Sequence, residues 1–176
     1  MANLELIDLL EEPVAAALAT GLQKYANVDT HILVYDFGGG TLDVTILKVA
    51  NNRFYVVSMA GDDYLGGQDI DNILIDTVID QYLSENNEGE ERTKPEIRSN
   101  KKLLAAFKTA ISQVKVELAG NGINAAEISI DALGEDGWLH SLSRATFEQV
   151  VFEEHKEGGK TFTERMLAPI DKVFEN

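Results

Sequence analysis

The feature that most constrains this chain is a short segment in which three glycines separate two apolar stretches. It reads Tyr35-Asp36-Phe37-Gly38-Gly39-Gly40-Thr41-Leu42-Asp43-Val44. The stretches on either side, residues 31–37 and 42–50, are rich in residues that favour strands. A glycine link this short between them predicts an antiparallel hairpin. Within the turn the backbone N–H groups have no side chains around them, so a ligand can approach the backbone closely.

The acids and the hydroxyl around this turn predict a site for a phosphate-bearing ligand. Exposed backbone N–H groups bind phosphate oxygens, and the carboxylates of Asp36 and Asp43 suit a hydrated Mg²⁺ ion. Thr41 can hydrogen-bond a terminal phosphate or a water molecule. Each of these residues alone also fits an ordinary turn. Their combination favours a nucleotide site, although the P-loop and dinucleotide-binding patterns are both absent.

Glu12 lies just before Pro13, at the expected start of an alanine-rich helix over residues 14–22. From the residues alone, we interpret Glu12 as a first-turn acid that complements the helix dipole. A role as a third carboxylate near the metal is the alternative.

Composition excludes several classes of protein. The chain has 176 residues, 44% of them hydrophobic, which is enough for a real core. Its net charge of −15 argues against nucleic acid as a partner, because phosphate contacts need clustered Lys and Arg. No apolar run is long enough to cross a membrane. There is no cysteine, which fits a reducing compartment. We expect a cytoplasmic location, with the endoplasmic reticulum and other compartments left open.

The remaining elements follow from periodicity and turn residues. A third strand is expected over residues 53–60, and a helix over 68–83. A polar linker over 84–98 contains an acidic loop tip at 85–91. Further along, we expect a helix over 100–119, a hairpin of strands 126–133 and 138–143, a helix over 146–154 capped by Thr146, an interruption over 155–161 and a helix over 162–174.

Four segments together resemble one family, the DnaK-type seventy-kilodalton heat-shock chaperones. They are Glu12-Pro13-Val14-Ala15-Ala16-Ala17, the glycine segment above, Ala60-Gly61-Asp62-Asp63-Tyr64-Leu65-Gly66-Gly67-Gln68-Asp69-Ile70-Asp71-Asn72, and Ser143-Arg144-Ala145-Thr146-Phe147-Glu148. The resemblance is to the second lobe of the nucleotide-binding domain. It implies an α/β fold with an RNase H-like (actin-like ATPase) core sheet and a small α+β outer subdomain. The implied division is a core subdomain over 1–84, the outer subdomain over 85–143 and a helical return over 144–176.

The resemblance also implies roles for residues. Glu12 and Asp36 would hold Mg²⁺ through water, with Asp43 nearby, and Thr41 and Asp43 would line a K⁺ site. The glycines, Gly38 to Gly40, would donate to the β- and γ-phosphates of ATP or ADP, and Thr41 would contact the γ-phosphate or orient the attacking water. Glu12, Asp36 and Thr41 are thus the expected catalytic residues.

The helix that contacts adenosine in the family is altered here. Ser112, Lys115 and Val116 occupy positions where the family has Glu, Lys and often Arg, and Ala119 replaces a Ser. We therefore expect Lys115 and Ser112 to be the nucleotide contacts on this helix. Loss of a carboxylate that accepts from the ribose hydroxyls would weaken binding by about 1.5–3 kcal/mol.

At the level of the whole protein, the resemblance implies a chaperone that hydrolyses ATP to drive folding cycles. Nucleotide-exchange factors, J-domain co-chaperones and unfolded polypeptide clients are the implied partners, with no nucleic acid and no membrane. Lys48 and Arg53 stand where the family often carries acids that attract J domains, which disfavours docking there.

No segment matches the family's first lobe or its catalytic Lys. We therefore expect a part of a longer protein that does not hydrolyse ATP by itself. The alternative is a divergent, non-hydrolysing scaffold or co-chaperone lobe. An actin-like or sugar-kinase relative is a third interpretation.

Overall fold

The computed structural model describes residues 5, 7, 9–21, 29–51, 53–86, 92–133 and 137–175. It divides into two compact units, one from residues 1–66 and 165–176 and the other from residues 67–164. The described residues form six α-helices, one π-helical segment and seven strands, which pair in small antiparallel sheets. This is a mixed α/β fold, as expected. The RNase H-like assignment and the subdomain boundaries at 84 and 143 stay predictions.

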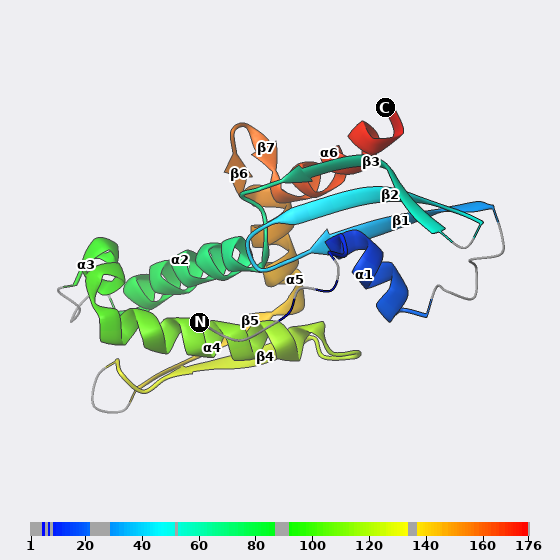
Figure 1. Ribbon diagram of the computed structural model, residues 1–176. Helices are drawn as coiled ribbons and strands as arrows, with labels where there is room; N and C mark the ends of the chain where they lie inside the picture. Colours follow the sequence, from blue (N-terminus) through cyan, green and yellow to red (C-terminus); the bar gives the residue numbers. More distant parts are fainter. Residues whose placement is uncertain are drawn as a thin grey trace. The chain divides into compact units, whose positions relative to one another are not determined.

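The first unit contains a three-stranded antiparallel sheet in the order β1-β2-β3 (Figure 1). The strands are β1 (Thr30–Phe37), β2 (Leu42–Ala50) and β3 (Arg53–Asp62). The predicted hairpin and third strand are therefore confirmed, with β3 running two residues past its expected end. The register pairs Asp36 with Asp43 and Phe37 with Leu42. The glycines are thus confined to the turn.

Two helices cover opposite faces of this sheet (Figure 1). On one face, Val14 and Ala17 of α1 (Glu12–Ala19) pack against Leu47 of β2. The partly buried residues of this cluster are Leu18, Ile32, Val34 and Phe54. On the other face, the Tyr35 hydroxyl donates to the carbonyl oxygen of Met166 in α6 (Phe162–Glu175) at 3.1 Å. Val34 and Tyr35 are adjacent on β1, and adjacent strand residues point to opposite faces.

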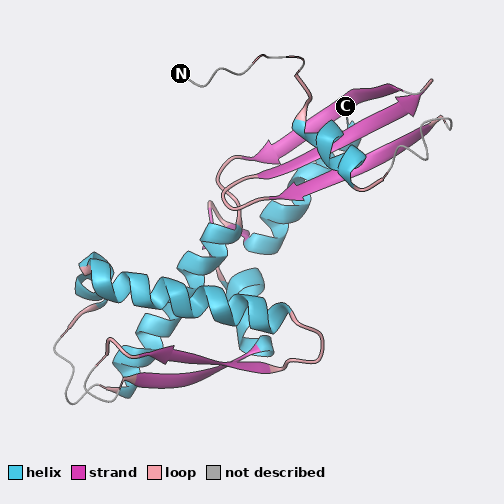
Figure 2. Ribbon diagram, turned by 60° about the horizontal axis from the view of Figure 1, so that its bottom comes forward, coloured by secondary structure: helices cyan, strands magenta, loops and turns pink. Residues whose placement is uncertain are grey.

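The second unit is built from helices packed on a hairpin. Its helices are α2 (Gly67–Glu85), α3 (Lys94–Ser99) and α4 (Lys101–Ala119), and α4 lies along the hairpin of β4 (Ala125–Ile130) and β5 (Trp138–Ser143), as Figure 2 shows. There follow α5 (Arg144–Glu148), the π-helical segment η2 (Gln149–Glu154) and a small hairpin of β6 (Lys156–Glu157) and β7 (Lys160–Thr161). Fully buried core residues include Leu74, Ile75, Ile79, Phe107, Ile111, Ile128 and Ile130.

The predicted polar linker over 84–98 was wrong in its second part, because α3 forms there. The Glu96 carboxylate accepts hydrogen bonds from the backbone N–H and the hydroxyl of Thr93, both at 2.7 Å. Ile97 is completely buried. A cap and one buried apolar side chain thus anchor a helix too short to show a periodic pattern.

Two other boundaries were also wrong. Ser143, not Thr146, caps α5, since its Oγ accepts from the Thr146 backbone N–H at 3.0 Å. β4 ends at Ile130 rather than Leu133. Of the predicted acidic loop tip, Glu85 instead ends α2, and Glu88, Glu90 and Glu91 lie outside the described residues. The first helix was predicted to run to residue 22, which was also wrong, because α1 ends at Ala19 and the next residue, Thr20, is its C-cap. None of the helices in the described part combines the length and the hydropathy that a membrane crossing requires.

Candidate functional site

In the glycine turn between β1 and β2, the Gly38 N–H donates a hydrogen bond to the Thr41 carbonyl oxygen at 2.9 Å. Gly39, Gly40 and Thr41 are exposed. Glycine is often required where φ is positive, but none of the three glycines in this turn, all of them described residues, has a positive φ. Space around the backbone, rather than an unusual conformation, is therefore what glycine provides here.

The space beside Gly40 is open. A Cβ atom placed on Gly40 would meet no protein atom within 4 Å, whereas one placed on Gly38 would lie 3.4 Å from the Thr41 carbonyl oxygen. Protein packing therefore does not require glycine at position 40. A ligand that approaches the backbone closely would require it.

A cavity of about 330 Å³ lies beside the two residues that flank the turn. Its lining combines four carboxylates with a few apolar and hydroxyl side chains, from Glu11, Glu12, Pro13, Val34, Asp36, Asp43, Thr45 and Met59. The structure thus brings together the three residues expected to hold a metal. Thr45 is almost completely buried, at 1% exposure, so the floor of the cavity belongs to the sheet.

The sheet register and the docking of α1 explain this grouping. Asp36 and Asp43 are direct partners across the hairpin, as are Val34 and Thr45. Directly opposed side chains lie on the same face of a sheet. That face is the one covered by α1, whose first residues bring Glu12 and its neighbour Glu11 to the cavity.

Glu11 is the residue that sequence reasoning missed. It occupies the N-cap position of α1 with an extended backbone, but its side chain makes no capping hydrogen bond. An acid directly before a helix normally indicates a cap. The sequence could have indicated Glu11 through its position beside Glu12, for which a role near the metal was the alternative interpretation.

The oxygen donors around this cavity suit a hard divalent cation such as Mg²⁺. Among the residues that the structure describes, however, no group of three acidic or histidine side chains is placed to ligate one ion directly. Mg²⁺ usually keeps several waters of its shell when it binds to a protein. Glu12, Asp36 and Asp43 would hold such an ion through its water.

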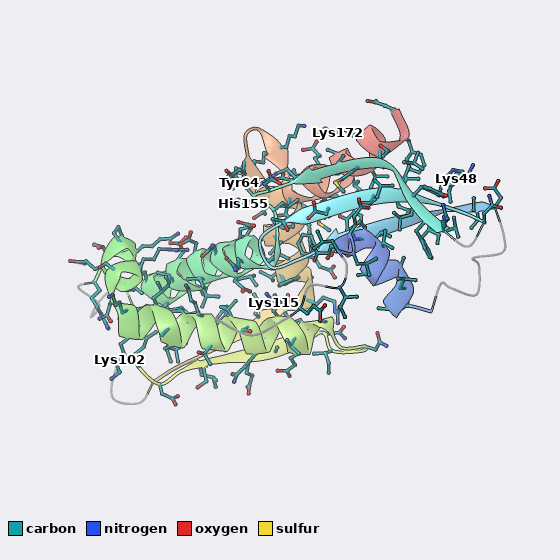
Figure 3. The ribbon with its side chains drawn as sticks, viewed as in Figure 1. Lys48, Tyr64, Lys102, Lys115, His155 and Lys172 are labelled. Atoms are coloured by element: carbon teal, nitrogen blue, oxygen red, sulfur yellow. The ribbon has the colours of Figure 1, made fainter. Side chains whose placement is uncertain are left out.

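The two remaining candidates, Ser112 and Lys115, belong to the second unit. Lys115 projects from α4 towards α2, as Figure 3 shows, where its Nζ lies 2.5 Å from Asp71 Oδ1 and 3.3 Å from the Gly67 carbonyl oxygen. Ser112 is exposed, and Val116 is 71% exposed. Lys115 is thus held inside its own unit rather than projecting freely into solvent.

Comparison with known families gives a match over almost the whole chain. The family model described as Hsp70 protein matches residues 1–175. The chain belongs to the Hsp70 family. This confirms the resemblance drawn from the four sequence segments, and it places the chain among the Hsp70 chaperones. Hsp70 proteins bind ATP and Mg²⁺ and work with co-chaperones. The Hsp70 match does not divide the chain into lobes, so its place in the second lobe stays a prediction.

Proposed function

We propose that this chain is the second lobe of an Hsp70 ATPase domain and supplies its phosphate- and magnesium-binding half. The observation that carries the proposal is the open backbone at Gly40, next to the paired carboxylates Asp36 and Asp43. Both features belong to one sheet in one compact unit.

The resemblance to the Hsp70 family supplies the roles that we propose for these residues. The N–H groups of Gly38 to Gly40 donate to the β- and γ-phosphates, and Thr41 contacts the γ-phosphate or orients the attacking water. Glu12 and Asp36 hold hydrated Mg²⁺, and Asp43 and Thr41 line a K⁺ site. Bound Mg²⁺ offsets the negative charge of the phosphates. Phosphoryl transfer of this kind depends mainly on positioning and electrostatic stabilisation.

In a longer parent protein, a first lobe completes the cleft and ATP hydrolysis drives cycles of client binding. Exchange factors, J-domain co-chaperones and unfolded polypeptides are the proposed partners. The positive pair Lys48 and Arg53 disfavours J-domain docking at that end of the sheet. Lys48 lies 3.7 Å from Asp29, and both side chains are well exposed, so this ion pair leaves Lys48 accessible.

The decisive test is an amide NMR titration of the chain with Mg-ADP, made on the wild type and on Gly40→Ala. We expect shifts at Gly38 to Thr41 in the wild type. Gly40→Ala should leave the spectrum of the free protein and its thermal midpoint unchanged, because its methyl group meets only open space. It should weaken Mg-ADP binding at least tenfold, because the methyl group lies where the phosphate must approach.

An Asp36→Asn variant provides the matched test of the carboxylates. It should reduce the dependence of ADP binding on Mg²⁺ while keeping the fold. The proposal is wrong if Gly40→Ala binds Mg-ADP as well as the wild type does, since the glycines would then serve only the turn.

A second candidate function is a non-hydrolysing Hsp70 scaffold. The observation that favours it lies on α4, where Lys115 is already paired with Asp71 and the neighbouring positions carry the uncharged Ser112 and Val116. Such a helix offers few groups to an adenosine. Shifts confined to the glycine turn, with none around Lys115, would support a degraded base pocket; tight binding with turnover in the parent protein would exclude the scaffold.

A further inference from the structure

A single arginine of α6 forms hydrogen bonds with the chain at the end of β3. The Arg165 guanidinium donates to both carboxylate oxygens of Asp62 at 3.0 Å, and to the Tyr64 carbonyl oxygen at 2.7 Å. The side chains of Arg165 and Asp62 are only 12% and 24% exposed. Asp62 in turn accepts from the Tyr64 backbone N–H at 3.0 Å. A bidentate pair shielded from solvent, with a third bond to the backbone, holds its partners in one geometry.

The residues held by Arg165 lead directly to the glycine turn. Two residues after Tyr64, the backbone of Gly66 packs against that of Gly39 and Gly40. A Cβ placed on Gly66 would lie 2.4 Å from the Gly40 nitrogen and 2.5 Å from the Gly39 carbonyl carbon. Gly66 is buried. Residues 63–66 therefore form a short strap between the arginine contact and the turn.

The residue that follows the turn, Leu42, is also connected to the Arg165–Asp62 contact. Asp62 pairs in the ladder with Leu42, the residue that follows Thr41. Next to it, Gly61 pairs with Asp43, and a Cβ on Gly61 would lie 2.5 Å from the Leu42 carbonyl oxygen. The backbone of β3 is thus fitted tightly against the start of β2. Through Asp62, Arg165 reaches both Gly39–Gly40 and the strand that leaves the turn.

We propose that Arg165 is a positioning residue for the phosphate-binding backbone. This proposal rests on the proposed function of the turn, and it extends that function to a side chain outside the four sequence segments that resemble the Hsp70 family. The turn has no side chains of its own at Gly38 to Gly40, and the backbone of Gly66 packs directly against it, so contacts from outside the turn help to fix its geometry. Arg165 supplies this support through Asp62 and the strap 63–66, and it does not itself contact the phosphates.

The first test measures the turn without any ligand. Backbone order parameters from ¹⁵N relaxation should be near 0.85 at Gly39, Gly40 and Thr41 in the wild type and should fall below about 0.6 in Arg165→Ala, the range of flexible backbone. Val44 and Val49, in the same sheet, should keep their values.

Arg98→Ala is the matched control. Arg98 also donates to a carboxylate, Asp76 at 2.6 Å, and to a backbone carbonyl oxygen, that of Asn72 at 3.2 Å. It lies in the second unit, so its loss should leave the order parameters of the turn unchanged. This control separates the loss of any arginine pair from the loss of this one.

The second test measures affinity for Mg-ADP. Arg165→Ala should weaken Mg-ADP binding at least tenfold, while the thermal midpoint of the second unit stays unchanged. Arg165→Lys should recover part of the lost affinity, because lysine keeps the positive charge but cannot make the two parallel hydrogen bonds of the guanidinium. Asp62→Asn should lower the order parameters of the turn in the same way. The double variant Arg165→Ala/Asp62→Asn should bind Mg-ADP no more weakly than either single variant does.

The outcomes are distinguishable from those of the proposed function. If the wild type fails to bind Mg-ADP, the nucleotide proposal is wrong while the order parameters still decide the role of Arg165. If Arg165→Ala and Asp62→Asn both leave the turn as rigid as in the wild type, the positioning role is wrong whatever the affinity. Should Arg165→Ala fail to fold, Arg165→Lys and Asp62→Asn carry the same comparison.

Discussion

At the scale of single residues, glycine serves different physical purposes in this chain. Gly158 and Gly159 have positive φ in the tip between β6 and β7, where other residues would be strained. Gly66 leaves no room for a side chain, and Gly40 leaves open space. Only the last of these is naturally explained by a ligand. A glycine pattern in a sequence cannot distinguish these three purposes, because each depends on neighbouring atoms in the folded structure that the pattern does not contain.

Gly66→Ala should be destabilising. Its methyl group would lie about 2.4 Å from the backbone of the turn, where no flexible side chain can move aside. We expect a loss of about 1–3 kcal/mol in the free energy of unfolding, as for other overpacked sites, together with shifted amide signals of Gly39 and Gly40. Urea unfolding measures the first and NMR the second. Gly40→Ala is the control, and equal midpoints for the two variants would contradict the packing described here.

At the scale of elements, α1 depends on the sheet for its place. Leu47 is fully buried beneath Val14 and Ala17. Leu47→Ala should cost about 2–5 kcal/mol, the range for buried leucines. It should also weaken Mg²⁺-dependent ADP binding, since α1 brings Glu11 and Glu12 to the cavity.

Leu74→Ala is the matched control, because Leu74 is equally buried but lies in α2 of the second unit. Denaturant midpoints and ADP titrations on both variants decide the matter. If both variants lose ADP affinity equally, α1 docking has no special connection to the site.

The end of α2 is attached to β5 by a carboxylate. Glu85 accepts from Gln81 at 2.6 Å and from the Trp138 indole N–H at 2.9 Å, and lies 3.3 Å from His140. The hydrogen bond from Gln81, followed by those from Trp138 and His140, lowers the pKa of Glu85 below its ordinary value of 4.5. Trp138 also stacks on His140, with ring centroids 5.3 Å apart.

This pKa shift predicts a dependence of stability on pH. Because the folded-state pKa lies below the unfolded one, the contribution is complete above about pH 4.5 and is lost as the pH falls through the folded value. Glu85→Gln should remove that part of the acid sensitivity. The fluorescence of Trp138, the only tryptophan, reports the change. The control is Glu117→Gln, on an exposed part of α4, which should show the same acid unfolding transition as the wild type. If Glu85→Gln also shows the wild-type transition, this prediction is wrong.

The elements that the sequence predicted well are those with long periodic patterns. The strands around the glycines and the helix α4 have many residues that agree with one period. α3 was missed because six residues with one buried side chain, Ile97, show no period. The cap at Ser143 was missed because Ser143 and Thr146 are both good caps, and only the three-dimensional contact distinguishes them.

At the scale of the whole molecule, we predict that the chain alone does not turn over ATP. Its sequence has a single glycine hairpin of this kind and no segment that resembles the family's first lobe with its catalytic Lys. If the chain is the nucleotide-binding lobe that we propose, it should still respond to Mg-ADP, and at 100 times the Kd the ligand should add about 2.7 kcal/mol to the stability of the unit it binds. Phosphate release assays and thermal unfolding test the two parts. Steady turnover that Asp36→Ala abolishes would show that the half-site is sufficient.

The carboxylates of the candidate site could be predicted from the sequence, but Glu11 and Arg165 could not. Asp36, Asp43 and Glu12 lie in segments whose pattern carries the chemistry. Glu11 and Arg165 do not, because one looks like a cap and the other like an ordinary charged residue of a helix. Their parts depend on which side chains the fold brings near, and for Arg165 the partner is 103 positions away.

That separation has a consequence for the order in which the protein is made. The three strands are neighbours in sequence, so the hairpin around the glycines needs only local loop closure and can form as soon as it leaves the ribosome. Arg165 follows Asp62 by 103 residues, which at about 5–20 residues per second is a delay of about 5–20 s. A nascent chain therefore has the outline of its glycine turn well before it has the arginine that we propose to position it.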